Sequence, residues 1–224
     1  MMNIFLDFDG TLADSSEGIY IAFAKACEHV GINAPPLIEF RSHIGPPVQI
    51  LAQQLFPKIE ADRLEALRLE FRTEYDRKYY KRVQWYEGVI EGLQKLHTQE
   101  TMRLSVVTNK PTSPTQKLVA NAGLSDLFEW IVGVDYRVAH RNGPVFRSKH
   151  DSICHALSLT ECPAKRSIYV GDTLSDQRAC QESGVAFIAA TYGFHSWQPQ
   201  ELEGTTSACS FREVANLLRS RVLH

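Results

Sequence analysis

The chain of 224 residues is 44% hydrophobic and 22% charged, and its formal net charge is −2. This length allows one large domain, or one domain that carries a smaller insert. The nearly balanced charge gives no argument for binding nucleic acid or an anionic membrane surface, so neither is expected as a partner. No stretch approaches the roughly 18 apolar residues that a membrane-spanning helix needs, so no such helix is expected.

The cysteines and the N-terminus indicate the cellular compartment. The five cysteines are scattered, odd in number and without a Cys-x-x-Cys pair (Cys27, Cys154, Cys162, Cys180 and Cys209). This pattern favours reduced thiols over a disulfide framework or a zinc site. The N-terminus has no basic segment followed by an apolar stretch, so no signal peptide is expected. We therefore expect a cytoplasmic protein.

The first expected element is a short strand, and a helical block follows it. Residues 4–6 form a continuous apolar run, which is typical of a strand buried on both faces of a parallel sheet. Residues 14–30 have one apolar helical face and stop at Gly31, and a long polar helix is expected from about residue 60 to residue 82. No strand-like alternation occurs between residue 14 and about residue 85. This block is therefore predicted to be an all-helical insert.

After residue 87 the pattern alternates between helices and strands. Strands are expected at 103–107, 130–132, 167–170 and 185–188, with a polar loop before a helix at about 151–159 and a last helix at about 211–219. Such alternation is typical of an α/β protein with a doubly wound, Rossmann-like parallel sheet. We expect this core to comprise residues 1–14 and 83–224, and the helical insert to comprise residues 15–82.

Two expected strands run directly into pairs of acidic residues. Asp7 and Asp9 follow the first strand, and Asp172 and Asp176 follow the strand at 167–170. Open α/β sheets place their chemistry at the carboxyl ends of the strands. A turn alone would explain Asp9 and Gly10, but it would leave Asp7 at the end of a buried strand unexplained. The acids therefore indicate a site for a metal cation.

Two further segments carry polar groups that have less distinctive patterns. The strand at 103–107 runs into Thr108, Asn109 and Lys110, whose hydroxyl and turn amides could hold phosphate oxygens, although Thr-Asn is also a common turn. Lys149 stands at the start of a predicted helix, where a lysine is usually solvated. Ser175 or Asp176 could be a helix cap. None of these segments is decisive by itself.

Taken together and in this order, the four segments resemble the motifs of the haloacid dehalogenase superfamily. Its phosphatases carry Asp-x-Asp-Gly-Thr, then a strand ending in Ser or Thr, then a lysine, then Gly-Asp-x-x-x-Asp. The resemblance covers nearly the whole chain, and the helical insert looks like the family's C1-type cap. The lysine segment departs from the frequent Lys-Pro form, but residues 148–153 fit a variant seen near phosphoglycolate phosphatases. Residues 44–47 also look like that branch.

The resemblance implies a role for each matching residue. Asp7 would be the nucleophile, which is ionised at pH 7 at its ordinary pKa and would form an aspartyl phosphate. Asp9 would protonate the leaving oxygen and then activate water. Lys149 would neutralise charge beside Asp7. Phosphate would be held by Thr108 and by the neighbouring amides, with Gly10 and Asn109 as substrate-binding positions. A metal ion would be held by Asp7, the backbone carbonyl of Asp9 and Asp172, and Asp176 would either bind it through water or orient Lys149.

Charge repulsion explains why such a site needs a metal. A phosphate dianion must approach a carboxylate with other acids nearby, and each like-charge pair at about 4 Å costs roughly 4 kcal/mol at an effective dielectric constant near 20. Oxygen ligands and an open position for phosphate suit Mg²⁺. We therefore expect Mg²⁺ as the cofactor of a phosphatase acting on a small-molecule phosphomonoester.

Several other activities occur on similar scaffolds. A true dehalogenase lacks the second acid, and a phosphonate hydrolase uses a cap lysine, whereas no lysine lies between Lys25 and Lys58. A sugar phosphomutase keeps all four motifs and stays open as an alternative. A phosphorylatable signalling module is the non-enzyme alternative, although such modules are about half this length and lack the insert. Steady release of phosphate would separate an enzyme from such a module.

The substrate itself is not encoded in these motifs. A cap should close over the site and select the leaving group, and Arg41 and His43 are the candidates for contacting the non-phosphate part. The basic run at 77–82 continues a helix and is interpreted as a solvated face. The basic loop at 137–147 could steer anionic substrates. The oligomeric state is expected to be a monomer or a homodimer.

Overall fold

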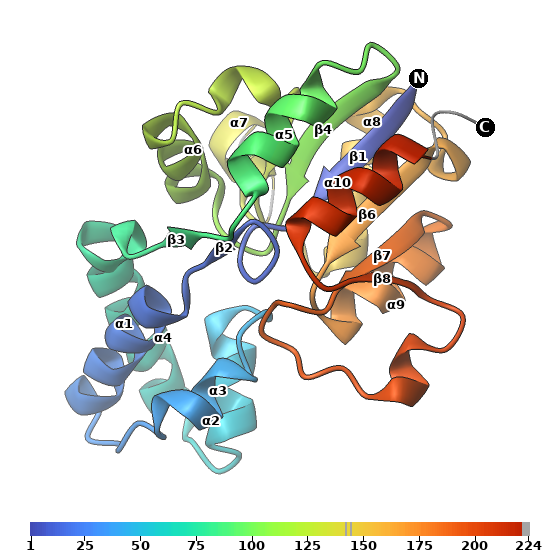
Figure 1. The fold of residues 1–224 in the computed structure, drawn as a ribbon. Helices are drawn as coiled ribbons and strands as arrows, with labels where there is room; N and C mark the ends of the chain where they lie inside the picture. The colour runs from blue at the N-terminus through green and yellow to red at the C-terminus, as the bar shows by residue number, and fades with distance from the viewer. Residues whose placement is uncertain (142, 144, 221–224) are drawn as a thin grey trace. The chain divides into compact units, whose positions relative to one another are not determined.

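The computed structural model describes residues 1–141, 143 and 145–220 of the chain, and the side chain of Arg141 lies outside that description. It divides into two compact units, Met1–Ala13 with Trp85–His224 and Asp14–Gln84. The first unit contains a six-stranded sheet in the order β5-β4-β1-β6-β7-β8 (Figure 1). Its strands are β1 (Met2–Leu6), β4 (Met102–Val107), β5 (Trp130–Val132), β6 (Ser167–Gly171), β7 (Ala186–Ala190) and β8 (Thr206–Ala208).

Every neighbouring pair of strands in this sheet is parallel. The chain runs outward from β1 through β4 to β5, then returns beside β1 and continues outward through β6, β7 and β8. This reversal beside β1 is the topological switch point at which open α/β sheets bind their ligands. The expectation of an α/β protein with a doubly wound parallel sheet is confirmed.

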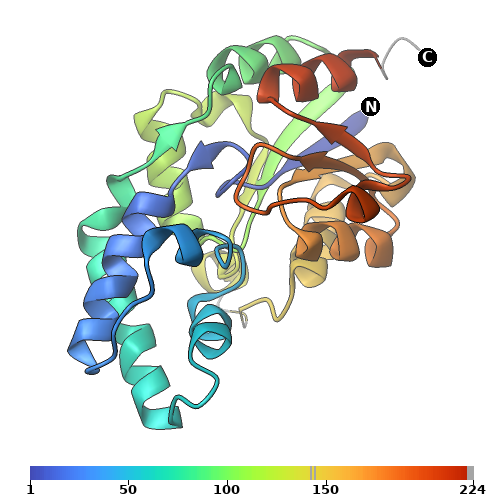
Figure 2. The same ribbon diagram turned by 60° about the horizontal axis from the view of Figure 1, so that its bottom comes forward.

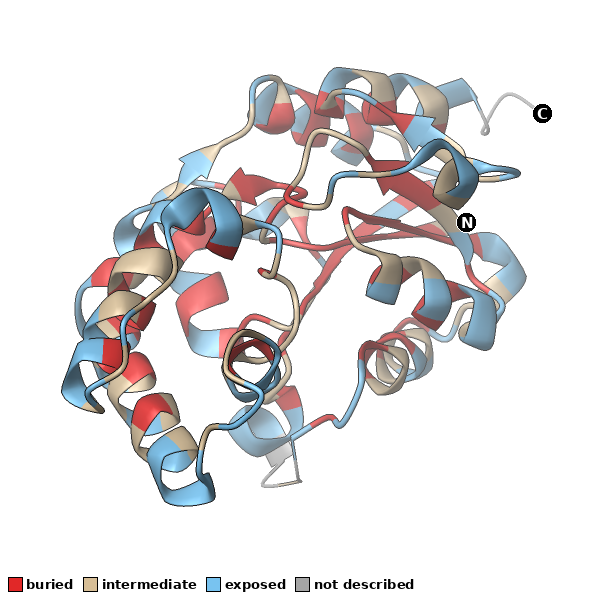
Figure 3. Cartoon of the chain, turned by 90° about the horizontal axis from the view of Figure 1, so that it is seen from below, coloured by how far each residue is buried: buried red, intermediate tan, exposed pale blue. Residues whose placement is uncertain are grey.

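Helices cover both faces of the sheet. Figures 1 and 2 show α5 (Val89–His97) and α10 (Phe211–Ser220) over one face, and α8 (Lys149–Thr160) and α9 (Leu174–Ser183) over the other. Apolar residues of β1, β4 and β6 alternate between these two layers, so the strands are buried on both sides, as the red segments of Figure 3 show. The remaining helices of this unit are α6 (Thr112–Asn121) and α7 (Tyr136–Arg141), with short 3-10 turns at Ser125–Leu127, Ala164–Arg166 and Pro199–Leu202.

The second unit is built from helices. Its elements are α1 (Ser16–His29), α2 (Leu37–Arg41), α3 (Val48–Leu55), α4 (Ala61–Arg77) and a 3-10 turn at Tyr79–Lys81. Buried aromatic rings join them, and Phe40 of α2 packs on Phe23 of α1 with ring centroids 4.8 Å apart. Gly18 allows close packing in α1, because a Cβ there would lie 2.4 Å from the carbonyl oxygen of Tyr79.

Four sequence expectations were wrong in detail. The polar helix expected to reach residue 82 ends at Arg77, and part of the expected loop at 137–147 is the helix α7. The loop's Asn142 and Pro144 lie outside the described residues. The short strand β8 was not expected. Two-residue strands β2 (Ala13–Asp14) and β3 (Gln84–Trp85) also form a small sheet of their own, where the chain passes from one unit to the other.

Across the described ranges, no helix is long and apolar enough to cross a membrane. All five cysteines have free thiols.

Candidate active site

Strand register brings the motif residues together at one edge of the sheet. Leu6 of β1 lies opposite Val106 of β4 on one side and Val170 of β6 on the other. The chain segments that follow these three residues therefore leave the sheet at the same edge, at its carboxyl ends. Asp7, Thr108 and Asp172 are close in space for this reason, although 165 positions separate the first from the last in the sequence.

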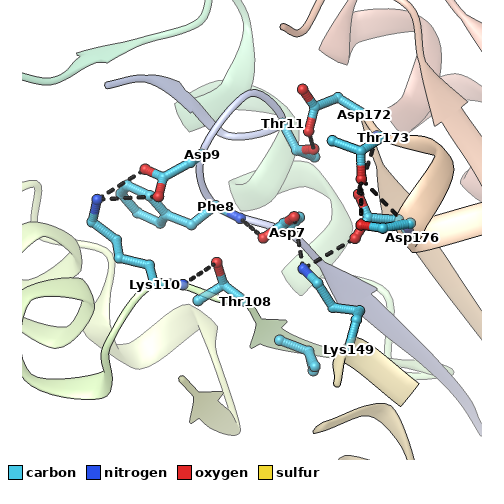
Figure 4. Close-up of polar contacts among 12 residues, drawn as sticks. Asp7, Phe8, Asp9, Thr11, Thr108, Lys110, Lys149, Asp172, Thr173 and Asp176 are labelled. Carbon is cyan, nitrogen blue, oxygen red and sulfur yellow. Dashed lines mark hydrogen bonds and ion pairs between the residues drawn. The ribbon is translucent and has the colours of Figure 1, made fainter. Parts of the chain in front are cut away.

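Asp7 is buried at the end of β1 and held through both carboxylate oxygens. Its Oδ1 accepts a hydrogen bond from the amide of Phe8 at 2.8 Å, and its Oδ2 accepts one from Lys149 Nζ at 2.8 Å (Figure 4). Burial raises the pKa of Asp7 from 3.8 to about 6, against the attraction of Lys149, with Asp176 adding to the rise. The metal-free site therefore disfavours negative charge on this carboxylate.

Lys149 is the first residue of α8, and its side chain is buried. Its ammonium group has three neighbouring acceptors, because Nζ lies 2.8 Å from Asp7 Oδ2, 2.9 Å from Tyr169 Oη and 3.0 Å from Asp176 Oδ1. The Tyr169 hydroxyl donates its own proton to the carbonyl of Val107 at 2.7 Å. Burial by itself lowers the pKa of Lys149, but Asp176 and Asp7 outweigh it, so the net shift is upward. This lysine stays charged.

Asp176 is fixed at the start of α9 by a capping box. The Thr173 hydroxyl donates to Asp176 Oδ2 at 2.6 Å, the Thr173 amide donates to the same oxygen at 3.1 Å, and the Asp176 amide donates back to the Thr173 hydroxyl at 3.3 Å. The N-cap is Thr173, not Ser175 or Asp176, and Asp176 belongs to the capping box as its third residue. The same carboxylate also faces Lys149, so one residue stabilises the helix and balances the lysine.

Asp172 is buried between two glycines. Its Oδ2 accepts a hydrogen bond from the amide of Phe194, in the loop after β7, at 2.7 Å. A Cβ at Gly10 would lie 2.1 Å from Asp172 Oδ2, and a Cβ at Gly193 would lie 2.3 Å from Asp172 Cβ, so both positions require glycine. Burial, followed by the charges of Asp176 and Asp7, raises the pKa of Asp172 well above its usual value.

The chemistry of these carboxylates fits a hard divalent cation. Asp7, Asp172 and Asp176 each offer an oxygen, and these oxygens lie within 4.8 Å of one another. Three buried carboxylates face the single ammonium group of Lys149, so negative charge is in excess. Burial, with the neighbouring acids adding to it, raises the pKa values of Asp7 and Asp172. Oxygen ligands in this arrangement suit Mg²⁺.

Asp9 lies apart from this carboxylate cluster. Its two oxygens lie 2.9 and 3.2 Å from Lys110 Nζ, and Figure 4 shows the Asp9 side chain pointing toward Lys110 and away from Asp7. Thr108 is buried at the end of β4 and accepts a hydrogen bond from the Lys110 amide at 3.2 Å. Asn109 beside it is half-buried. The main chain turns at Gly10, whose φ is +80°.

The other sequence candidates lie elsewhere in the chain. Arg41 and His43 belong to the helical unit, where Arg41 forms an ion pair of 2.9 Å with Asp14. His43 is half-buried in the turn after α2. In the basic segment at 137–147, the Arg147 amide donates to Asp151 Oδ2 at 3.0 Å.

Three residues of the site were missed by sequence reasoning. Lys110 was considered only as part of the turn after the strand at 103–107, and Tyr169 and Phe194 were not considered as site residues. Tyr169 gives a weak signal in the sequence, since its hydroxyl lies in the middle of a buried, mostly apolar central strand. Phe194 gives none, because it acts through its backbone amide.

Comparison with known proteins agrees with this geometry. The family model for haloacid dehalogenase-like hydrolases matches residues 4–190. A phosphoglycolate phosphatase of Pseudomonas syringae pv. syringae is 30% identical over 202 residues, covering 88% of this chain and 71% of that protein. Another, from Cereibacter sphaeroides, is 27% identical and covers 98% of both chains. The solved structure of a haloacid dehalogenase-like family hydrolase from Streptococcus pneumoniae superposes with a TM-score of 0.84 at 27% identity, covering 97% of this chain and 98% of that one. The chain therefore belongs to the haloacid dehalogenase-like hydrolases and resembles their phosphoglycolate phosphatases, as its motifs predict.

Proposed function

We propose that this protein is a Mg²⁺-dependent phosphatase that hydrolyses a small-molecule phosphomonoester through an aspartyl phosphate on Asp7. The observation that carries the proposal is the position of Asp7. Its carboxylate contacts Lys149, which also contacts Asp176, and it belongs to the buried group of the carboxylates of Asp7, Asp172 and Asp176. The named relatives are phosphoglycolate phosphatases, so 2-phosphoglycolate is the first substrate to test.

In this mechanism Asp7 attacks phosphorus and the ester oxygen leaves. Lys149, fixed by its three acceptors, holds the nucleophile in place and offsets its charge as the phosphate arrives. The Thr108 hydroxyl and the amides around Asn109 and Gly10 bind phosphate oxygens. Asp9 gives a proton to the leaving oxygen and then takes one from the water that hydrolyses the aspartyl phosphate. Splitting the reaction in this way replaces one difficult step with two easier ones.

The carboxylates of Asp7, Asp172 and Asp176 and the backbone carbonyl of Asp9 are proposed to hold Mg²⁺. When bound, the ion supplies positive charge that lets a phosphate dianion approach the acidic site.

We further propose that the helical unit is a cap and that Arg41 and His43 contact the non-phosphate part of the substrate. The free cysteines support a cytoplasmic location. The oligomeric state is proposed to be a monomer or a homodimer.

The experiment is a screen of phosphomonoesters with Mg²⁺, including 2-phosphoglycolate, sugar phosphates and an aryl phosphate. Steady release of phosphate that stops with EDTA and returns with Mg²⁺ is expected, and Asp7→Asn should abolish it for every ester. Isomerised sugar phosphate without release would indicate a phosphomutase. A single phosphorylation per chain would indicate a signalling module. Full activity in EDTA would contradict the proposed metal site.

A further inference from the structure

Asp7 and Asp9 are separated by one residue, and each carboxylate is held by its own buried lysine. Lys149 binds Asp7 and Lys110 binds Asp9, and the two side chains point in different directions (Figure 4). The Lys110 side chain is 2% exposed and that of Asp9 is 17% exposed. The family motifs assign a role to the first lysine, whereas Lys110 has none in the mechanism above.

Lys110 is itself held firmly on the core unit. Its amide donates to the Thr108 hydroxyl at 3.2 Å, and its carbonyl accepts from the Val134 amide at 3.3 Å. The ammonium group lies 5.5 Å from the centre of the buried Phe8 ring, a cation–π contact. The hydrogen bonds of the Lys110 backbone and the Phe8 ring beside its side chain therefore restrict the position of Nζ.

We propose that Lys110 is a positioning residue that fixes the direction of the Asp9 carboxylate. The inference rests on the proposed function, in which Asp9 exchanges protons with the leaving oxygen and with water. Nζ lies 2.9 and 3.2 Å from the two oxygens of Asp9, so turning the carboxylate about its Cβ–Cγ bond or moving it to another rotamer lengthens at least one contact. A side chain that is partly exposed would otherwise sample several rotamers, and a proton donor acts only from a narrow range of positions.

The test is Lys110→Met, measured with two substrates that differ in their need for a proton. An alkyl phosphate needs its leaving oxygen protonated, whereas an aryl phosphate releases a stable phenolate. Lys110→Met is expected to lower the single-turnover rate by about 10²-fold with the alkyl ester and by less than about 5-fold with the aryl ester. A role in folding alone would lower both rates equally, because it would reduce the fraction of native protein.

Lys149→Met is the matched control, because it also removes a buried lysine from an aspartate of this motif. Its losses should be similar for the two esters, since the nucleophile attacks both. In an Asp9→Asn background, Lys110→Met should change either rate by less than about 3-fold, because the group that it positions is already gone. If Lys110→Met does not fold, Lys110→Gln provides the same comparison.

Equal losses with the two esters, or losses that multiply with those of Asp9→Asn, would overturn the inference. A crystal structure of the Lys110 variant tests the positioning without any activity. Asp9 is expected to leave its wild-type rotamer, and an unmoved Asp9 would also overturn the inference. If the wild type releases phosphate from neither ester, the proposed function fails, and the crystal structure still decides the role of Lys110.

Discussion

At the scale of single residues, Asp7 is unusual because its ionised carboxylate lowers the stability of the metal-free protein. The carboxylate is buried, and its pKa is raised to about 6 by that burial despite the adjacent lysine. In the proposed function this nucleophile needs the ionised form, so the protein keeps at the end of β1 a charge that its own surroundings disfavour. Function and stability therefore make opposite demands on this residue.

The raised pKa of Asp7 predicts a pH dependence of the metal-free protein. Between pH 3.8, the usual pKa of an aspartate, and about pH 6, the folded state binds more protons than the unfolded state. The protonated Asp7 therefore contributes fully to stability below pH 3.8, and this contribution is lost as the pH rises through about 6. The full effect is at most about 3 kcal/mol. Asp7→Asn cannot titrate. In EDTA, the Tm of Asp7→Asn minus that of the wild type should grow from pH 5 to pH 7.

The subtraction removes the titrating groups that do not interact with Asp7, which behave alike in both proteins. A Tm difference that is the same at pH 5 and pH 7 would show that Asp7 does not titrate in this range.

At the scale of secondary-structure elements, the ends of two elements hold the acidic side chains. The capping box at the start of α9 holds Asp176, and the loop after β7 holds Asp172 through the Phe194 amide. Carboxylates that ligate a metal commonly depend on such hydrogen bonds for their orientation. Residues without any reactive group thus contribute to the proposed metal site.

Thr173→Ala should weaken both the helix and the metal site. Loss of an N-cap side chain costs about 1 kcal/mol of stability. Because the Thr173 hydroxyl also donates to Asp176 at 2.6 Å, its removal should weaken Mg²⁺ binding by roughly 10–100-fold. Calorimetric titration with Mg²⁺ measures the affinity, and thermal unfolding in EDTA measures the stability.

Ser210→Ala is the matched control, because Ser210 accepts a hydrogen bond from the Glu213 amide at the start of α10. It should cost similar stability and leave Mg²⁺ affinity unchanged. Equal Mg²⁺ affinities in the two variants would show that Thr173 acts on the helix alone.

The elements that the sequence predicted are those with a strong apolar pattern. Strands β1, β4, β5, β6 and β7 were expected close to their observed positions because their residues are buried and apolar. Strand β8, with the sequence Thr-Ser-Ala, lacks such a pattern and forms by pairing with β7. Helix α4 ends at Arg77 although the polar pattern continues, and periodicity gives no sign of that end. Tertiary pairing and packing decided these cases.

The same distinction between sequence pattern and tertiary contacts applies to the candidate site. The acids at strand ends were found because charge after a buried strand is rare. The motif resemblance also predicted Lys149 beside Asp7. The Phe194 amide on Asp172 and Lys110 on Asp9 could not be predicted, because these contacts depend on three-dimensional neighbours. The pairing of Lys110 with Asp9, and not with Asp7, is a matter of side-chain direction at the end of β4.

At the scale of the whole molecule, positive and negative charges nearly cancel, to a net charge of −2, but the acidic residues are not evenly distributed. Asp7, Asp172 and Asp176 are buried together with one lysine at the edge of the sheet. Concentrating carboxylates in this way destabilises the folded state. Under the proposed function, binding of Mg²⁺ at this site would offset that cost, so stability and occupancy of the site would be linked.

This linkage predicts opposite effects of Asp172→Asn without and with Mg²⁺. In EDTA at pH 7 the variant should have a higher Tm than the wild type, because it loses a buried carboxylate whose pKa is raised and still offers an oxygen to the Phe194 amide. A gain of about 1 kcal/mol corresponds to roughly 2–4 °C for a chain of this size. Saturating Mg²⁺ should then raise the Tm of the wild type, by about 2.7 kcal/mol of stability at 100 times the Kd, and leave the variant nearly unchanged.

Asp126→Asn, which removes one exposed carboxylate, is the control and should behave as the wild type in both conditions. A variant that is less stable than the wild type in EDTA, or equally stabilised by Mg²⁺, would show that Asp172 has a structural role and does not hold the ion.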